Sequence, residues 1–152
     1  MIMNEPLIRP AGPLDEIAWT RLFTGYRDFY RLTADETVVK RVWSWILDPH
    51  HETHSIVAEF NGVVIGIADY RTFARPSTGT TGVWLDDLFT DPEHRGRGVG
   101  RSLIEYLQDS AQQHGSSIVR WITAEDNREA RQLYDTLASR TNWVTYDASP
   151  RT

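Results

Sequence analysis

Cysteine is absent from this chain of 152 residues. Its absence excludes disulfide bonds, thiolate metal sites and a cysteine nucleophile. Long apolar runs are also lacking, because the longest near-apolar stretch, 63–68, is far shorter than the roughly 20 residues that a membrane helix needs. The first thirty residues carry several charges and show no signal peptide. We therefore expect a cytoplasmic protein that does not associate with membranes.

Basic residues are fewer than acidic residues. Sixteen Lys and Arg stand against 21 Asp and Glu, which gives a net charge of −5 with His neutral. This balance opposes binding to nucleic-acid phosphates and favours a cationic partner. With 40% hydrophobic and 24% charged residues, the composition is that of a folded globular protein. The length fits one domain, which we expect to span residues 1–152.

Helical and strand patterns alternate along the chain. Apolar residues at helical spacing predict helices over 14–31, over 33–46 from a capping box at Thr33–Glu36, over 99–114, and over 127–137. Strand patterns cover 7–10, 55–60, 63–70, 83–90, 118–123 and 143–146, and Asn61-Gly62 predicts a hairpin turn. The stretch 75–82 is rich in Pro, Gly, Ser and Thr and predicts a loop.

A glycine-rich turn precedes the third predicted helix. Gly96, Gly98 and Gly100 alternate with Arg95, Arg97, Val99 and Arg101. Such a turn exposes main-chain N–H groups at a helix N-terminus, which is typical of a phosphate-binding site. The dinucleotide fingerprint does not fit, since Arg101 stands where its third glycine belongs, and the P-loop lysine is missing. The alternative is a plain turn between a strand and a helix.

Two adjacent carboxylates, Asp86 and Asp87, interrupt the predicted strand 83–90. Neighbouring strand residues point to opposite faces of a sheet, so one of the two faces the core unless a bulge redirects it. We expect a bulge near 86–88, with one aspartate at a functional site and the other supporting the bulge.

The pattern Arg95-x-x-Gly98-x-Gly100, preceded by Leu85-Asp86-Asp87-Leu88-Phe89-Thr90-x-Pro92, resembles the acetyl-CoA signature of the GNAT superfamily of N-acetyltransferases. A second block, Asn127-x-x-Ala130-x-x-Leu133-Tyr134, is similar to the downstream motif of that family, and Trp121-x-Thr123 resembles its polyamine/histone acetyltransferase branch. The resemblance implies one α/β domain with a mixed, mostly antiparallel sheet flanked by about four helices.

The resemblance also implies a cofactor site. Main-chain N–H groups of Arg95, Gly96, Arg97, Gly98, Val99, Gly100, Arg101 and Ser102 would hold the pyrophosphate of coenzyme A. The strand at Leu88, Phe89 and Thr90 would pair with the pantetheine arm, with the N–H of Leu88 directed at the thioester carbonyl. Asn127 would cap its helix and contact the same arm.

Acetyl transfer to an amine requires a neutral nucleophile, whereas an alkylammonium group has a pKa near 10.4. Deprotonation at pH 7 therefore costs about 4.6 kcal/mol. We expect Asp86 to attract the cation and take its proton, or alternatively to serve only as a hydrogen-bond acceptor in the bulge. Asp87 borders the amine site in the same interpretation. The resemblance implies that Tyr134 protonates the departing thiolate, although its place on an apolar stripe also fits a packing role.

Aromatic residues of the first helix, Tyr26, Phe29 and Tyr30, are candidates for the wall of the acceptor pocket. The segment His50-His51-Glu52-Thr53-His54 is one residue short of the metalloprotease motif, and Pro49 opposes the helix which that motif requires. We expect a solvated loop there and no metal site.

Taken with the resemblance, these features predict an enzyme that transfers an acetyl group from acetyl-CoA to a primary amine by direct attack. The acceptor would be a polyamine, an amino acid or a lysine-type amine. The alternative is a module of the same fold that binds acetyl-CoA as a sensor without turning it over. A homodimer formed through the predicted strand 143–146 is a further expectation.

Overall fold

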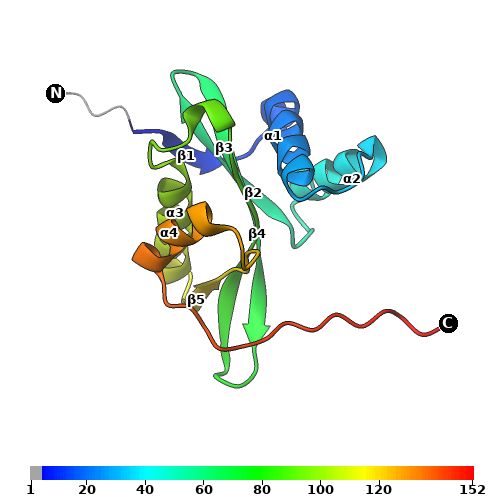
Figure 1. Cartoon of the computed structure of the whole chain (residues 1–152), viewed down its shortest axis with the longest axis vertical. Coiled ribbons are helices and arrows are strands. Elements are labelled where there is room, and N and C mark those ends of the chain that lie inside the picture. Colours follow the sequence, from blue (N-terminus) through cyan, green and yellow to red (C-terminus); the bar gives the residue numbers. More distant parts are fainter. Residues whose placement is uncertain (1–4) are drawn as a thin grey trace. The chain divides into compact units, whose positions relative to one another are not determined.

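The computed structural model describes residues 5–152. They form two compact units, one ending at Ile122 and the other beginning at Thr123. The first unit contains a five-stranded sheet with the order β1-β2-β3-β4-β5. Its strands are β1 (Leu7–Pro10), β2 (His54–Phe60), β3 (Val63–Arg75), β4 (Thr80–Thr90) and β5 (Ser116–Arg120). Neighbours are antiparallel except β4 and β5, which are parallel, so the mixed and mostly antiparallel sheet is confirmed (Figure 1).

Helices cover both faces of this sheet, as Figure 1 shows. Helices α1 (Glu16–Phe29) and α2 (Glu36–Leu47) lie on one face, where Trp19, Phe23 and Trp43 pack against strand residues such as Ile67. Helix α3 (Val99–Gln113) lies on the other face. There Gly66 of β3 gives room for Val99, because a Cβ at Gly66 would stand 2.7 Å from a Val99 methyl group.

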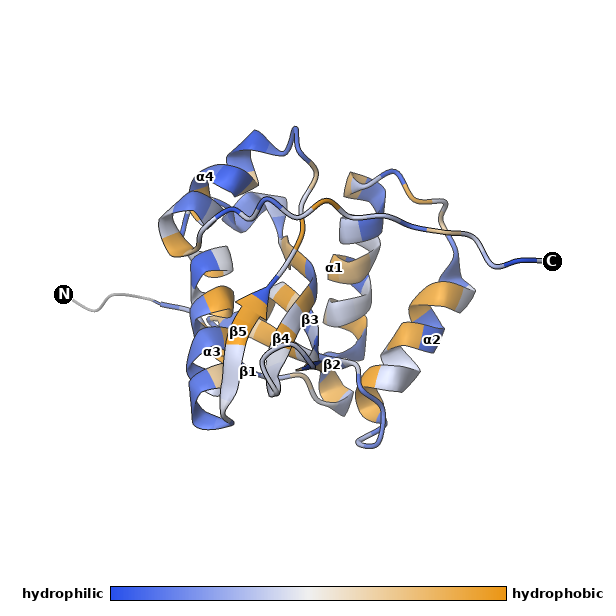
Figure 2. Ribbon diagram, turned by 90° about the horizontal axis from the view of Figure 1, so that it is seen from below, coloured by the Kyte–Doolittle hydropathy of each residue, from blue (hydrophilic) through white to orange (hydrophobic). Residues whose placement is uncertain are grey.

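The amphipathic pattern of α3 explains how it packs. Its apolar stripe consists of Val99, Leu103, Ile104, Leu107 and Ala111, and all five side chains are buried. The orange stripe of α3 in Figure 2 faces the strands, while its blue residues face solvent. The helix ends at His114, and Gly115 follows with a positive φ of 74°, as the sequence pattern predicts.

Turns form where the sequence places them. Asn61 and Gly62 have φ values of 50° and 78°, which suit a tight hairpin between β2 and β3. Strands β3 and β4 extend further than predicted, so that only residues 76–79 remain as a turn of the expected loop 75–82. Within residues 5–152 no helix is both long and apolar enough to cross a lipid bilayer.

Two local expectations are wrong. Helix α2 is capped by Asp35, whose carboxylate accepts from the amides of Thr37 and Val38, rather than by Thr33. Residues 143–146 form no strand, and Trp143, Val144 and Tyr146 are exposed. Aromatic and β-branched residues make a strand only where a neighbouring strand offers hydrogen bonds and packing. The dimer expected through this strand therefore loses its structural basis.

The second unit contains helix α4 (Arg128–Leu137). Asn127 caps it as predicted, since its side-chain oxygen accepts from the amide of Ala130 and its Nδ2 donates to the hydroxyl of Thr123 at 3.3 Å. Tyr134 is half-buried on the same stripe as Ala130, Leu133 and Leu137.

Candidate functional site

Strand β4 changes its surroundings half-way along. From Thr81 to Trp84 it pairs with β3 on one side and with β5 on the other. The last β5 contact joins Trp84 to Arg120, whereas pairing with β3 continues to Thr90. Within residues 5–152, the segment 85–90 therefore has a strand neighbour on one side only. Its second edge presents main-chain groups that a ligand can use.

A bulge lies at the point where the pairing changes. Leu85 is opposite Tyr70 and Asp87 is opposite Asp69, so Asp86 is an extra residue in β4. The bulge expected near 86–88 is thereby confirmed. An extra residue increases the local twist and redirects the side chains that follow it.

The glycine-rich turn connects β4 to α3 through a 3-10 helix, η2 (Pro92–His94). Gly96 and Gly98 have φ values of 77° and 78°, which non-glycine residues rarely adopt. No atom lies within 4 Å of where a Cβ would stand on either residue, so the space beside the turn is open to other groups.

The amides of this turn are available to a ligand. The amides of Gly96, Arg97, Gly98, Val99 and Gly100 donate to no acceptor among residues 5–152. By contrast, the amide of Ser102 already donates to the carbonyl oxygen of Gly98 at 3.0 Å, as does its hydroxyl. Ser102, which the sequence analysis includes in the anion site, therefore has no free main-chain N–H group for an anion. Unpaired amides at the start of a fifteen-residue helix attract anions through hydrogen bonds and the helix dipole.

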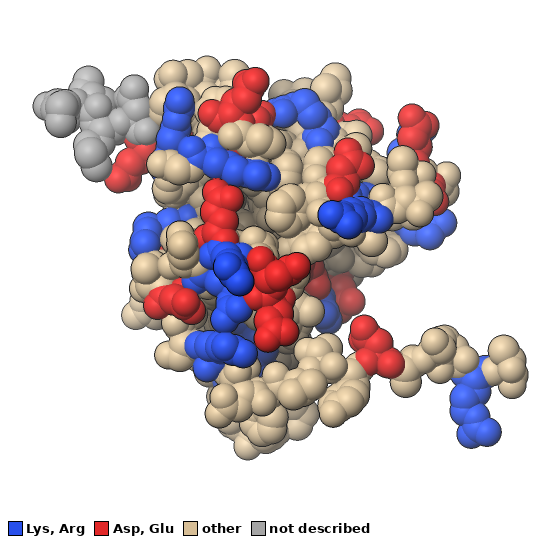
Figure 3. Space-filling model, in the orientation of Figure 1, with Lys and Arg blue, Asp and Glu red and all other residues tan. Residues whose placement is uncertain are grey.

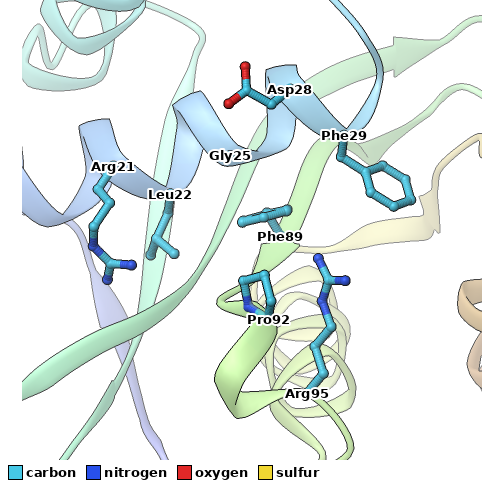
Figure 4. A pocket seen from close by; sticks show the side chains of 8 residues that line it. All are labelled: Arg21, Leu22, Gly25, Asp28, Phe29, Phe89, Pro92 and Arg95. Carbon is cyan, nitrogen blue, oxygen red and sulfur yellow. The ribbon is translucent and has the colours of Figure 1, made fainter.

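Arg95 links this turn to helix α1. Its guanidinium lies 5.3 Å from the ring centroid of Phe89 and 5.9 Å from that of Phe29, and its Nε donates to the carbonyl oxygen of Thr90 at 3.3 Å. In Figure 4 the guanidinium stands beside both rings. Arg101, the other basic residue of the helix start, forms an ion pair with Glu105 at 3.8 Å.

A cavity of about 410 Å³ opens beside Arg95 (Figure 4). Helix α1, β4 and the segment after it line this cavity with Arg21, Leu22, Gly25, Asp28, Phe29, Phe89, Pro92 and Arg95. A Cβ on Gly25 would stand 2.8 Å from Phe89, so glycine allows this ring to lie against the backbone of α1. The cavity combines aromatic walls with two arginines.

The two aspartates of the bulge have different surroundings. Asp86 is exposed and forms an ion pair with Nε of Arg71 at 3.3 Å. Burial raises the pKa of Asp86, and the positive charge of Arg71 partly opposes this effect. Asp87 is half-buried, and burial raises the pKa of this carboxyl as well.

A third carboxyl group, which the sequence analysis did not single out, lies opposite Asp87. Asp69 of β3 is 1% exposed and accepts from Nε1 of Trp19 at 3.2 Å. Burial, followed by the nearby charge of Asp87, raises the pKa of Asp69 well above its usual value. A sequence signal existed, because Asp69 is the single charged residue in the otherwise apolar first part of β3.

The aromatic candidates of α1 meet one another. Ring centroids of Tyr26 and Tyr30 lie 5.0 Å apart, and those of Phe29 and Tyr30 lie 5.1 Å apart. Phe29 lines the cavity, whereas Tyr26 lies near Asp87, whose charge adds to burial in raising the pKa of the Tyr26 hydroxyl. The histidines also have neighbours of their own: His51 stacks on Trp45 and His50 lies 3.6 Å from Asp48.

Comparisons with known proteins agree with this geometry. Residues 19–138 match the family model described as Acetyltransferase (GNAT) family. This chain belongs to the GNAT family. The resemblance found in the sequence is thus confirmed, and the chain is an acyltransferase of the N-acetyltransferase class.

Named relatives extend over most of the chain. It is 28% identical over 148 residues to the D-amino-acid N-acetyltransferase HPA3 of Saccharomyces cerevisiae, with 96% of this chain and 92% of the relative covered. It is 36% identical over 129 residues to the uncharacterized N-acetyltransferase YhfO of Bacillus subtilis, with 84% and 85% covered. A solved aminoglycoside N-acetyltransferase in complex with CoA has the same fold, with a TM-score of 0.81, 20% identity and 98% and 99% covered.

Proposed function

We propose that this protein transfers an acetyl group from acetyl-CoA to the primary amine of a small cationic acceptor. The observation that carries the proposal is the open edge of β4 from Leu85 to Thr90, followed directly by the unpaired amides of Gly96 to Gly100. One ligand that joins an extended amide chain to a diphosphate would fit both features. Coenzyme A has that form.

The diphosphate would bind to the turn. The amides of Gly96 to Gly100 supply hydrogen bonds, the α3 dipole supplies a positive potential, and Arg95, Arg97 and Arg101 add charge. The pantetheine arm would lie along Leu88, Phe89 and Thr90 and pair with their main-chain groups. In this arrangement the amide of Leu88 would donate to the thioester oxygen and stabilise the charge that develops there during attack.

The acceptor would approach from the side of the bulge. Asp86, Asp87 and Asp69 concentrate negative charge and carboxyl groups there, which favours an ammonium group over an anion. A bulge carboxylate would take the proton of the ammonium, and the neutral nitrogen would then attack the thioester carbonyl. Tyr134 would protonate the thiolate that leaves, and Asn127 would contact the cofactor arm.

An amino acid is the acceptor class that we place first, ahead of polyamines and lysine-type amines. The yeast relative is named for D-amino acids. In addition, Arg71 offers a cation beside Asp86, and its terminal guanidinium nitrogens have no hydrogen bond within residues 5–152. A zwitterionic acceptor carries both charges that such a pair can recognise.

The net charge does not decide between these acceptors. Acidic and basic side chains intermingle over the described residues on the face drawn in Figure 3. Recognition would therefore depend on individual residues at the bulge rather than on a broad field of one sign.

Two measurements test the proposal. Acetyl-CoA should raise the melting temperature of the protein, since a ligand that binds only the native state stabilises it. Release of free CoA should then depend on an added amine in a panel of D- and L-amino acids, polyamines and lysine peptides. Binding without release across the whole panel would favour the sensor module, and no binding would contradict the assignment.

A further inference from the structure

A pair of carboxyl groups lies inside the sheet between β3 and β4. Asp69 and Asp87 are direct neighbours across the antiparallel ladder. Asp69 is 1% exposed, and Trp19 donates to its Oδ1 at 3.2 Å. Its second oxygen, Oδ2, is buried and has no hydrogen-bond partner among the residues that the structure describes. A buried polar atom without a partner requires an explanation.

Ionised Asp69 would be very unfavourable in this position. A carboxylate without water or a cation pays a large desolvation cost, and a second carboxylate across the ladder adds repulsion. Burial and the charge of Asp87 accordingly raise the pKa of Asp69 well above its usual range. A neutral Asp69 removes both difficulties, because Oδ2 then carries a proton that it can donate toward Asp87.

The surroundings of Asp87 suit a carboxylate that accepts a proton from a substrate. It is half-buried, it has the carboxyl group of Asp69 on one side, and it has the hydroxyl of Tyr26 nearby. Asp86, by contrast, is engaged with Arg71. The titratable groups that face Asp87 are Asp69 from β3, Tyr26 from α1 and the adjacent Asp86 from β4. Arg71 from β3 and Glu52 from the loop before β2 lie beside Asp86.

We propose that Asp87 accepts the proton of the acceptor ammonium, and that Asp69 is a positioning residue, kept neutral, which donates a hydrogen bond to Asp87. This inference rests on the proposed function. The ammonium gives its proton to the Asp87 carboxylate, and the amine nitrogen forms a C–N bond with the acetyl carbon. The C–S bond breaks with its electron pair on the sulfur of CoA, which takes a proton from Tyr134, and the second proton that the nitrogen loses as the amide forms returns to Tyr134 through solvent. Asp87 then releases the proton to solvent.

The conservative variant Asp69→Asn separates this role from others. An asparagine amide can accept from Trp19 through its oxygen and donate to Asp87 through its nitrogen, as the neutral acid does. We expect kcat to stay within about threefold of wild type in Asp69→Asn and to fall about 100-fold or more in Asp87→Asn, the size typical of a lost general base.

Asp69→Leu has a similar volume and no donor. Loss of the hydrogen bond makes the Asp87 carboxylate less stable relative to its protonated form, so its pKa rises. The acidic limb of the kcat/KM profile should therefore move to higher pH in Asp69→Leu and stay in place in Asp69→Asn. Asp15→Asn is the control, because Asp15 is also buried, at 6% exposed, but pairs with Arg9. It should lower stability without moving the limb.

Infrared spectroscopy tests whether Asp69 is protonated, and it needs no catalytic turnover. At pH 7 the free protein should show the carbonyl band of a protonated carboxyl group, which Asp69→Asn should remove and Asp15→Asn should keep. Absence of this band, or an Asp69→Asn variant as impaired as Asp87→Asn, would overturn the inference while acetyl transfer by wild type still stands. Failure of wild type with every amine would overturn both the inference and the proposed function.

Discussion

The two halves of β4 have opposite roles although one continuous strand contains both. From Thr81 to Trp84 the strand has neighbours on both sides, and Gly82 is packed between Phe73 and Ile118. From Leu85 to Thr90 it pairs, among the described residues 5–152, with β3 alone, and this part begins with a bulge and carboxyl groups. The first half uses its main-chain groups to build the sheet, whereas the second leaves one set of them for a ligand. The proposed cofactor site therefore begins where pairing with β5 ends.

Tyr134→Phe is expected to lose activity on the scale of Asp87→Asn, and it tests whether a residue outside β4 takes part in the reaction. Loss of a general acid should lower turnover about 100-fold, with unchanged affinity for acetyl-CoA. Release of CoA in single-turnover experiments measures the first quantity and calorimetry the second. Normal turnover in this variant would assign Tyr134 a packing role only.

Gly98→Ala should weaken binding of CoA about 30-fold, because loss of well-placed amide hydrogen bonds to a charged group is worth about 2 kcal/mol. Gly62→Ala is the matched control, since Gly62 has the same φ of 78° and equally open surroundings in the hairpin turn. Both variants should lose similar stability. Equal affinities of the two variants in calorimetry would show that the turn does not bind the diphosphate.

Asp86→Asn compares the two bulge carboxylates. We expect about a fivefold fall in turnover, through loss of a partly screened negative charge beside the ammonium, and no change in acetyl-CoA affinity. Steady-state kinetics with an active amine measures the effect. A decrease as large as that of Asp87→Asn would make Asp86 the proton acceptor, which is the role expected from the sequence.

Gly82→Ala disturbs the half of β4 that pairs on both sides. A Cβ there would stand 2.7 Å from Phe73 and 2.8 Å from Ile118, so we expect a loss of about 1–2 kcal/mol in unfolding free energy from overpacking. Urea denaturation measures it. Turnover of the folded fraction should change less than twofold, and a larger change would show that the two halves are coupled.

Most of the fold could be predicted because its signals are local. The stripe of α3, the Asn61-Gly62 turn and the cap at Asn127 each depend on residues a few positions apart. The glycine turn could be predicted in the same way, since its backbone conformation requires Gly96 and Gly98.

The remaining features depend on residues far apart in the sequence. Nothing near Asp69 indicates that Asp87 will stand opposite it, because the pairing follows from the register of two long strands. The strand predicted at 143–146 fails for the same reason, since a strand needs a partner that its own residues do not specify. Thr33 and Asp35 are both residue types that cap helices well. Asp35 is the cap because its carboxylate reaches the first free amides of α2, those of Thr37 and Val38.

Asp86 also acts as a spacer. Because strand side chains alternate with a period of two, one additional residue in β4 inverts the parity of everything after it. If Asp86 paired with Asp69 instead of bulging, Asp87 would stand opposite Ala68 and Phe89 would point away from α1. Deleting Asp86 would keep Leu85 opposite Tyr70 and Asp87 opposite Asp69, so the following residues would keep their faces, and only the bulge with its additional twist would be lost.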